Sequence, residues 1–124
     1  MMLVDNQSGS RDLYPYILAL DPTAILTRID PPYGDVVWSG DGPDGPLSVA
    51  VEYKKISEVL GAITGDGRFG GHQVAGLIQH YDRRYLLIEG RIRMDRNTGI
   101  IQELKRDKWE TIYKGREAFT SRDL

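Results

Sequence analysis

The two strands expected on either side of the turn-rich stretch Ser39–Pro46 constrain the fold more than any other feature. Residues 47–53 alternate between apolar side chains and polar or small ones, which is typical of a strand with one buried face. Asp35–Trp38 predicts the beginning of another strand, and the glycines and prolines between the two segments predict a hairpin loop. If the two strands pair through that loop, Asp35 can lie near Glu52.

The remaining segments alternate between expected strands and helices. Further strands are expected over Met2–Val4, Ala24–Ile29 and Arg84–Ile88, the last so apolar that we expect a central strand buried on both faces. Helices are expected over Ser10–Leu20, Glu58–Ile63 and His72–Tyr81. Ser10 is expected to cap the first of these helices and Ser57 the second. Beyond Gly90 we expect strands over Gly99–Leu104 and Trp109–Tyr113 and a frayed end over Arg116–Leu124. This order predicts an α/β fold with a mixed central β-sheet flanked by helices.

The composition excludes several classes of protein. With 124 residues the chain has room for one domain with one modest core. It has no cysteine, which excludes disulfides and thiolate zinc sites, and it has no apolar run approaching the roughly 20 residues that span a bilayer. Its first residues lack the basic and apolar regions of a signal peptide, so we expect a cytoplasmic protein without a membrane partner.

The charge is distributed unevenly along the chain. Residues 1–90 contain 7 basic and 12 acidic side chains, a net charge of −5, whereas residues 91–124 contain 9 and 6, a net charge of +3. The overall charge of −2 argues against a protein that coats nucleic acid through its bulk charge. The basic segment is either a solvated tail or a surface that contacts a nucleic-acid backbone.

Asp35 and the segment Glu52-Tyr53-Lys54 form the candidate site. Glu52 and Lys54 project to the same side, because alternate residues of a strand share a face. Two carboxylates and an ammonium would then meet at the edge of the sheet. Carboxylate oxygens are ligands that Mg²⁺ or Mn²⁺ prefers, and an ammonium beside them can act on the water that attacks a phosphodiester. Taken alone, this spacing is also that of an ordinary surface ion pair.

The order Asp…Glu-X-Lys resembles the PD-(D/E)XK nucleases, and its surroundings resemble one family within that fold, the XPF/Mus81/Hef structure-specific endonucleases. The matching segments follow one another along residues 2–90: Leu3-Val4-Asp5, Gly34-Asp35, Val51-Glu52-Tyr53-Lys54, Glu58, Asp66-Gly67-Arg68-Phe69 with Gln73, and Leu86-Leu87-Ile88-Glu89-Gly90. The resemblance implies a restriction-endonuclease-like fold. It also implies a metal-dependent endonuclease that hydrolyses branched or flapped DNA in repair, recombination or replication.

The resemblance implies a role for each residue of the candidate site. Asp35 and Glu52 would bind Mg²⁺ or Mn²⁺ together with the backbone carbonyl of Tyr53. Lys54 would act on the attacking water, and Asp5 would lie close by as a further carboxylate. Around this set, Glu58 would shape the site or hold Lys54, Arg68 and Gln73 would contact the substrate or the acidic cluster, and Glu89 is a weaker candidate at the same sheet edge.

The sequence departs from the family pattern in three places. Tyr53 replaces an arginine, which removes a fixed cation, Glu58 replaces an aspartate, and one residue of Gly70-Gly71-His72 is additional. None of these changes removes an expected metal ligand. We therefore expect an active enzyme, with a non-catalytic DNA-binding or dimerisation module of the same fold as the alternative.

The resemblance also bears on domain organisation and partners. It assigns residues 1–90 to the nuclease core and residues 91–124 to an extension of the same domain. DNA is the expected partner, and a homodimer or heterodimer through the nuclease domain is expected because domains of this family commonly dimerise. The chain stops without an obvious closing element, so we expect it to be a piece of a longer protein.

Overall fold

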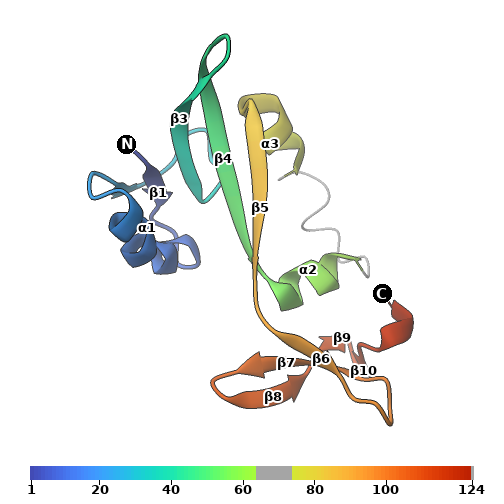
Figure 1. The fold of residues 1–124 in the computed structure, drawn as a ribbon. Helices are drawn as coiled ribbons and strands as arrows, with labels where there is room; N and C mark the ends of the chain where they lie inside the picture. Colours follow the sequence, from blue (N-terminus) through green and yellow to red (C-terminus); the bar gives the residue numbers. More distant parts are fainter. Residues whose placement is uncertain (64–73, 124) are drawn as a thin grey trace. The chain divides into compact units, whose positions relative to one another are not determined.

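The computed structural model of the protein describes residues 1–63 and 74–123 (Figure 1). The chain forms two compact units, the first made of Met1–Tyr53 and Gly71–Leu87 and the second of Lys54–Gly70 and Ile88–Leu124. No helix among the described residues is long and apolar enough to cross a membrane.

A five-stranded sheet with the strand order β2-β1-β3-β4-β5 is the main feature of the fold (Figure 1). Its strands are β1 (Leu3–Asp5), β2 (Ile25–Thr27), β3 (Val36–Gly42), β4 (Gly45–Lys55) and β5 (Arg83–Glu89). β1 pairs with β2 in parallel and with β3 in antiparallel orientation, and β3 and β4 are antiparallel. The predicted mixed sheet and the α/β class are therefore confirmed.

Helices of the first unit pack on both faces of its strands. A 3-10 helix η1 (Ser10–Leu13) continues into α1 (Tyr14–Leu20), and Leu13 packs in one core with Val4 and Val36. On the other face, Leu77 of α3 (Val74–His80) packs with Val37 and Ala50. Because successive residues of a strand point to opposite faces, neighbouring valines of β3 reach different cores.

Two local expectations about the first unit are wrong. The stretch Ser39–Pro46 is almost entirely strand, since β3 and β4 stay paired as far as Gly42 and Gly45 and leave only Pro43 and Asp44 in the turn. Glycine in an antiparallel ladder keeps both of its main-chain groups available for pairing, so turn-rich composition does not end the hairpin. Ser10 makes no capping hydrogen bond: Gly9 occupies the cap position of η1.

β5 forms where a strand was predicted, but the prediction that it is buried on both faces is wrong. Every residue of β5 is exposed, including Tyr85 at 57% and Leu87 at 47%. β5 is the last strand in the order of the sheet, so among the described residues it has a strand neighbour on one side only. The apolar run therefore predicted correctly that these residues form a strand. It predicted incorrectly that this strand is central in the sheet.

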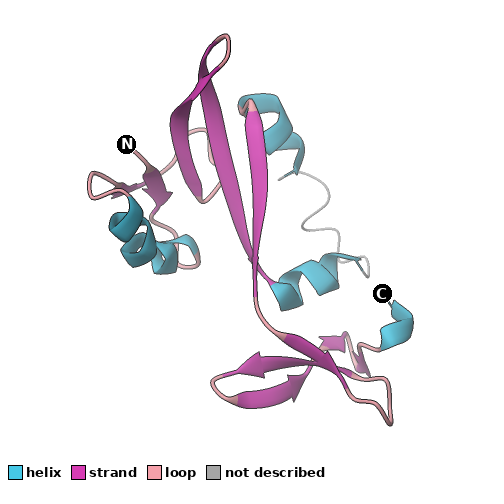
Figure 2. Cartoon of the chain, viewed as in Figure 1, coloured by secondary structure: helices cyan, strands magenta, loops and turns pink. Residues whose placement is uncertain are grey.

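The second unit has its own small core, and its helices and strands are coloured by type in Figure 2. Its elements are α2 (Ile56–Ile63), a three-stranded sheet of β6 (Ile92–Met94), β7 (Ile101–Lys105) and β8 (Lys108–Thr111), a two-stranded hairpin of β9 (Tyr113–Lys114) and β10 (Glu117–Ala118), and the 3-10 helix η3 (Ser121–Asp123). Leu60 of α2 packs with Ile101, Ile112 and the fully buried Phe119. The predicted frayed end is thus wrong, because Phe119 anchors it in the core.

Candidate functional site

Three acidic residues, Asp5, Asp35 and Glu52, occupy one row across neighbouring strands of the first unit. Asp5 ends β1, Asp35 immediately precedes β3, and Glu52 lies near the end of β4. Val4 of β1 pairs with Val36 of β3, and Val36 pairs with Val51 of β4. Asp5, Asp35 and Glu52 are each one residue away from these pairs in the direction that the antiparallel register sets, so they form a row across the three strands. The main-chain N–H of Asp5 donates to the carbonyl of Asp35 at 2.8 Å, in agreement with this register.

Gly34 forms the bend that precedes Asp35 in the chain. Its φ is +87°, a conformation that side-chain-bearing residues rarely adopt. A Cβ atom there would lie 3.2 Å from Val37 and 3.3 Å from Ala50, both of which belong to the core under α3. The Gly-Asp order of the sequence therefore has a physical reason, since only glycine fits the bend that delivers Asp35 to the start of β3.

The carboxylate of Asp35 is held by two hydrogen bonds. Its Oδ2 accepts from the main-chain N–H of Tyr53 at 2.7 Å, and its Oδ1 accepts from the hydroxyl of Ser10. Ser10 is only 5% exposed. Asp35 thus joins the last residues of β4 to the 3-10 helix, and its orientation is fixed. Local sequence patterns place Ser10 at a helix cap and so miss this contact, which lies 25 residues away in the chain.

Glu52 is the most enclosed acidic side chain of the row. It is 7% exposed and follows Ala50, which is fully buried, at the strand spacing that places both on one face. Burying a carboxylate is costly unless polar groups compensate its charge. Glu52 therefore occupies a position where an apolar residue would pack at less cost.

Lys54 and Glu58 belong to the second unit and pair with each other there. The Nζ atom of Lys54 lies 3.8 Å from Oε2 of Glu58, four residues further along the chain. The lysine side chain is 17% exposed and the glutamate side chain 54% exposed. Glu58 therefore restricts the position of the Lys54 ammonium, while a pair this open contributes little to stability.

The donors of the row suit a small hard cation by their chemistry. Mg²⁺ is commonly held by one or two carboxylates and keeps several of its waters. Asp35 and Glu52 provide two carboxylates, and each oxygen of Asp35 that accepts one hydrogen bond retains a further lone pair. Within residues 1–63 and 74–123, no group of three or more His, Asp and Glu side chains is close enough to form a metal site on its own.

Arg68 and Gln73 lie outside the residues that the structure describes, as does the whole segment Asp66-Gly67-Arg68-Phe69. Glu89 ends β5 and contributes to a cleft of the second unit. The structure therefore aligns Asp5, Asp35 and Glu52 along one row and pairs Lys54 with Glu58.

Comparisons with protein-family models, curated proteins and solved structures found no match to this chain.

Proposed function

We propose that the chain is a divalent-metal-dependent endodeoxyribonuclease with a restriction-endonuclease-like fold, and that its substrates are branched or flapped DNA. The observation that carries the proposal is the row of Asp5, Asp35 and Glu52 across three strands, with Lys54 two residues beyond Glu52. The collinear resemblance of residues 2–90 to the XPF/Mus81/Hef endonucleases supplies the choice of substrate.

The reaction has two electrostatic requirements. A water oxygen forms a bond to phosphorus while the bond from phosphorus to the ester oxygen breaks, so negative charge grows on the phosphate and on the leaving oxygen. Asp35, Glu52 and the carbonyl of Tyr53 would hold Mg²⁺ or Mn²⁺, which when bound lowers the pKa of water and offsets charge on the phosphate. The protein must supply a fixed arrangement of these donors.

The residues of the chain are suited to that task in different ways. The hydrogen bonds from Ser10 and from the N–H of Tyr53 hold the Asp35 carboxylate in one orientation. The burial of Glu52 keeps solvent from screening its charge. Lys54 would donate a hydrogen bond to the attacking water or to the phosphate, and its pair with Glu58 limits the positions that its long side chain can take.

The test is cleavage of branched DNA by Asp35→Asn and Glu52→Gln variants in the presence of Mg²⁺ or Mn²⁺. Each variant should lower the cleavage rate by about 100-fold or more, because loss of one charge-stabilising group at a reacting centre costs roughly that much. Asp41→Asn is the matched control, since it removes the same charge from an exposed position of β3. Inactive wild-type protein, or variants that cut as fast as Asp41→Asn, would refute the proposal.

A non-catalytic DNA-binding or dimerisation module is the second candidate. It is favoured by the fact that both carboxylate oxygens of Asp35 already accept hydrogen bonds that join β4 to η1. Calorimetric titration with Mn²⁺ separates the two candidates. The nuclease requires saturable binding that Glu52→Gln weakens, whereas a module in which Asp35 only stabilises the fold binds no metal at this row.

A further inference from the structure

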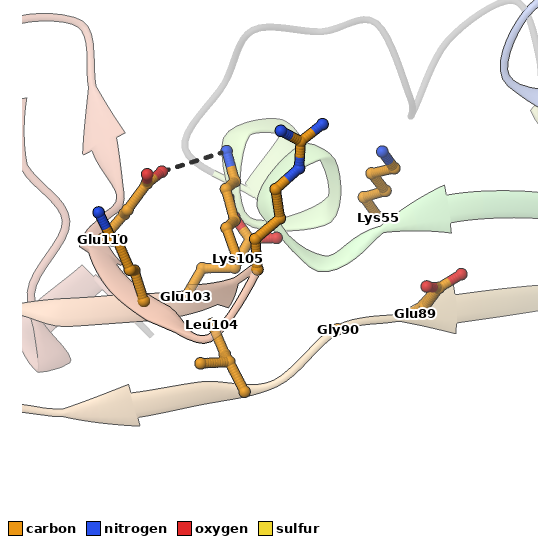
Figure 3. Close-up of a pocket in the computed structure, with 9 residues that line it drawn as sticks. Lys55, Glu89, Gly90, Glu103, Leu104, Lys105 and Glu110 are labelled. Carbon is orange, nitrogen blue, oxygen red and sulfur yellow. Dashed lines mark ion pairs between the residues drawn. The ribbon is translucent and has the colours of Figure 1, made fainter.

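A cleft of about 750 Å³ lies beside the β7–β8 hairpin of the second unit (Figure 3). Charged side chains dominate its lining, which includes the cations Lys55, Lys105, Arg106 and Lys108 and the carboxylates Glu89, Glu103 and Glu110. Figure 3 shows Lys55 and Glu89 on one side of the cleft and Lys105, Glu103 and Glu110 on the other. The composition of this lining indicates a ligand recognised by charge.

Two of the three carboxylates, Glu103 and Glu110, form ion pairs with the same lysine, Lys105. The Nζ atom of Lys105 lies 3.8 Å from Oε2 of Glu103 and 3.9 Å from Oε2 of Glu110. Glu103 is 5% exposed, so the nearby ammonium offsets a charge that is otherwise costly to bury. Lys105 is therefore largely neutralised by the protein and adds little charge for a ligand.

The other three cations of the cleft are not neutralised in this way. Lys55, Arg106 and Lys108 are exposed, and none of them forms an ion pair with a residue in the part of the chain that the structure describes. With four cations and three carboxylates the lining keeps a net charge of +1, and these three cations offer separate contacts to a ligand with several negative charges.

The turn of the β7–β8 hairpin has an unusual backbone conformation. Arg106 and Asp107 both have positive φ values, 48° and 69°, in a two-residue turn that usually contains glycine or asparagine. Lys105 and Lys108 are directly paired across the two strands, where like charges repel. Neither feature favours the hairpin, whose tip carries three cations and the single anion Asp107.

We propose that this cationic cleft, defined by Lys55, Arg106 and Lys108, binds the phosphodiester backbone of DNA. The inference rests on the proposed function in that it takes DNA as the partner. A polyanionic strand can enter a concave surface and place successive phosphates near separate cations, whereas a bilayer surface is flat and cannot. A single free phosphate would satisfy only part of the charge.

The test measures binding of fluorescently labelled branched DNA to the full chain in EDTA, so that neither metal nor cleavage contributes. The triple variant Lys55→Gln, Arg106→Gln, Lys108→Gln should bind at least roughly tenfold more weakly at low salt. It should also reduce the slope of log affinity against log salt by about 0.9 for each phosphate that the variant no longer neutralises. Unchanged affinity and slope would overturn the inference.

A second triple variant controls for net charge. Arg91, Arg96 and Arg116 are exposed, belong to the same unit and do not line the cleft. Their replacement by glutamine removes the same charge, and we expect a much smaller change in slope. Equal effects of the two triple variants would show that only bulk charge matters and would overturn the inference.

The variant Arg106→Gly distinguishes an effect on DNA binding from an effect on the stability of the fold. Glycine adopts the positive φ of this turn readily, so the thermal midpoint should stay the same or rise while DNA binding weakens. A variant that gains stability and binds DNA as the wild type does would count against the cleft.

Two competing ligands complete the test. Inorganic phosphate should compete with DNA only at concentrations far above those of the DNA phosphates, and vesicles of anionic phospholipid should bind more weakly than DNA. Tighter binding of either one would overturn the inference. Wild-type protein that binds DNA through these cations but never cuts it would retain the cleft while refuting the proposed nuclease.

Discussion

The acidic row of the first unit and the cationic cleft of the second use charge in opposite ways. Glu52 is buried and Asp35 is held by two hydrogen bonds, so the positions of the negative charges are fixed. Lys55, Arg106 and Lys108 are exposed. The proposed hydrolysis would require groups in one geometry, whereas the proposed binding of a phosphate chain would require only nearby charge.

The two regions also differ in which residues adopt positive φ in their backbone. The bend before Asp35 is made by glycine, whose positive φ carries no steric cost. The turn at Arg106 and Asp107 adopts positive φ with two side-chain-bearing residues. The bend before Asp35 thus carries little local strain, whereas the hairpin turn places two side-chain-bearing residues at positive φ.

The largest expected effect tests whether the second unit depends on its own core. Phe119→Ala removes a fully buried ring from the cluster of Leu60, Ile101 and Ile112 and should lower the free energy of unfolding by about 3–5 kcal/mol. Urea denaturation measures this decrease. Tyr113→Ala is the control, because Tyr113 is 64% exposed and its replacement should change stability by less than ~0.5 kcal/mol. Similar decreases in both variants would show that Phe119 is not an anchor.

The next effect concerns the bend before Asp35. Gly34→Ala should cost about 1–3 kcal/mol, because it forces a positive φ on alanine and presses a Cβ against Val37 and Ala50. Gly115→Ala isolates the backbone part, since Gly115 has φ +62° with open space around it. Thermal unfolding should therefore rank Gly34→Ala as the more destabilising variant. The reverse order would contradict the packing argument.

A smaller effect is expected at Ser10. Ser10→Ala removes the hydroxyl that donates to Asp35 and should cost about 1–2 kcal/mol, because a half-buried carboxylate oxygen loses its partner. If Asp35 binds metal, Mn²⁺ affinity measured by calorimetry should also fall by roughly tenfold, as it does when supporting hydrogen bonds of a ligand are removed. Ser8→Ala, at an exposed position nearby, should change neither quantity. A decrease in stability without a decrease in metal affinity would assign Ser10 a structural role alone.

The smallest effect is a dependence on pH in the second unit. The hydrogen bond from Lys114 holds the pKa of Asp123 below its usual range, with a further contribution from the N–H of Thr120. A lowered pKa stabilises the folded state at neutral pH, and this contribution is lost as the pH falls below the ordinary aspartate value of about 3.9. The difference in thermal midpoint between wild type and Asp123→Asn should therefore shrink in acid. A difference that stays constant from neutral to acidic pH would refute this assignment.

Neighbouring strands show what periodicity predicts and what it does not. Alternation in residues 47–53 indicated a strand with one buried face, yet Val49 and Ala50 of β4, which point to opposite faces, are both buried. The apolar run of β5 indicated burial, yet all of its residues are exposed. Hydrophobic pattern reports the preference of a side chain, whereas its exposure depends on which elements pack on that strand.

The positions of the strands were predicted well for the first unit, whereas the structure at the end of the second unit was predicted poorly. The strands around Leu3, Leu26 and Val51 were located from short apolar runs bounded by turns. Nothing local marked Phe119 as buried, because its partners come from α2 and β7. The contact of Trp109 is equally non-local, since the guanidinium of Arg93 lies 4.3 Å from the centre of its ring.

The sequence by itself determined the acidic residues, their order and the strand spacing of Glu52 and Lys54, because these depend only on residue identity and on the period of a strand. It also determined the glycine before Asp35. The tertiary structure decided that Asp5, Asp35 and Glu52 share one row, that Ser10 holds Asp35, and that Arg106 and Lys108 line a cleft with Lys55. Such contacts join residues far apart in the chain, and their geometry follows from strand register and core packing, which no local pattern encodes.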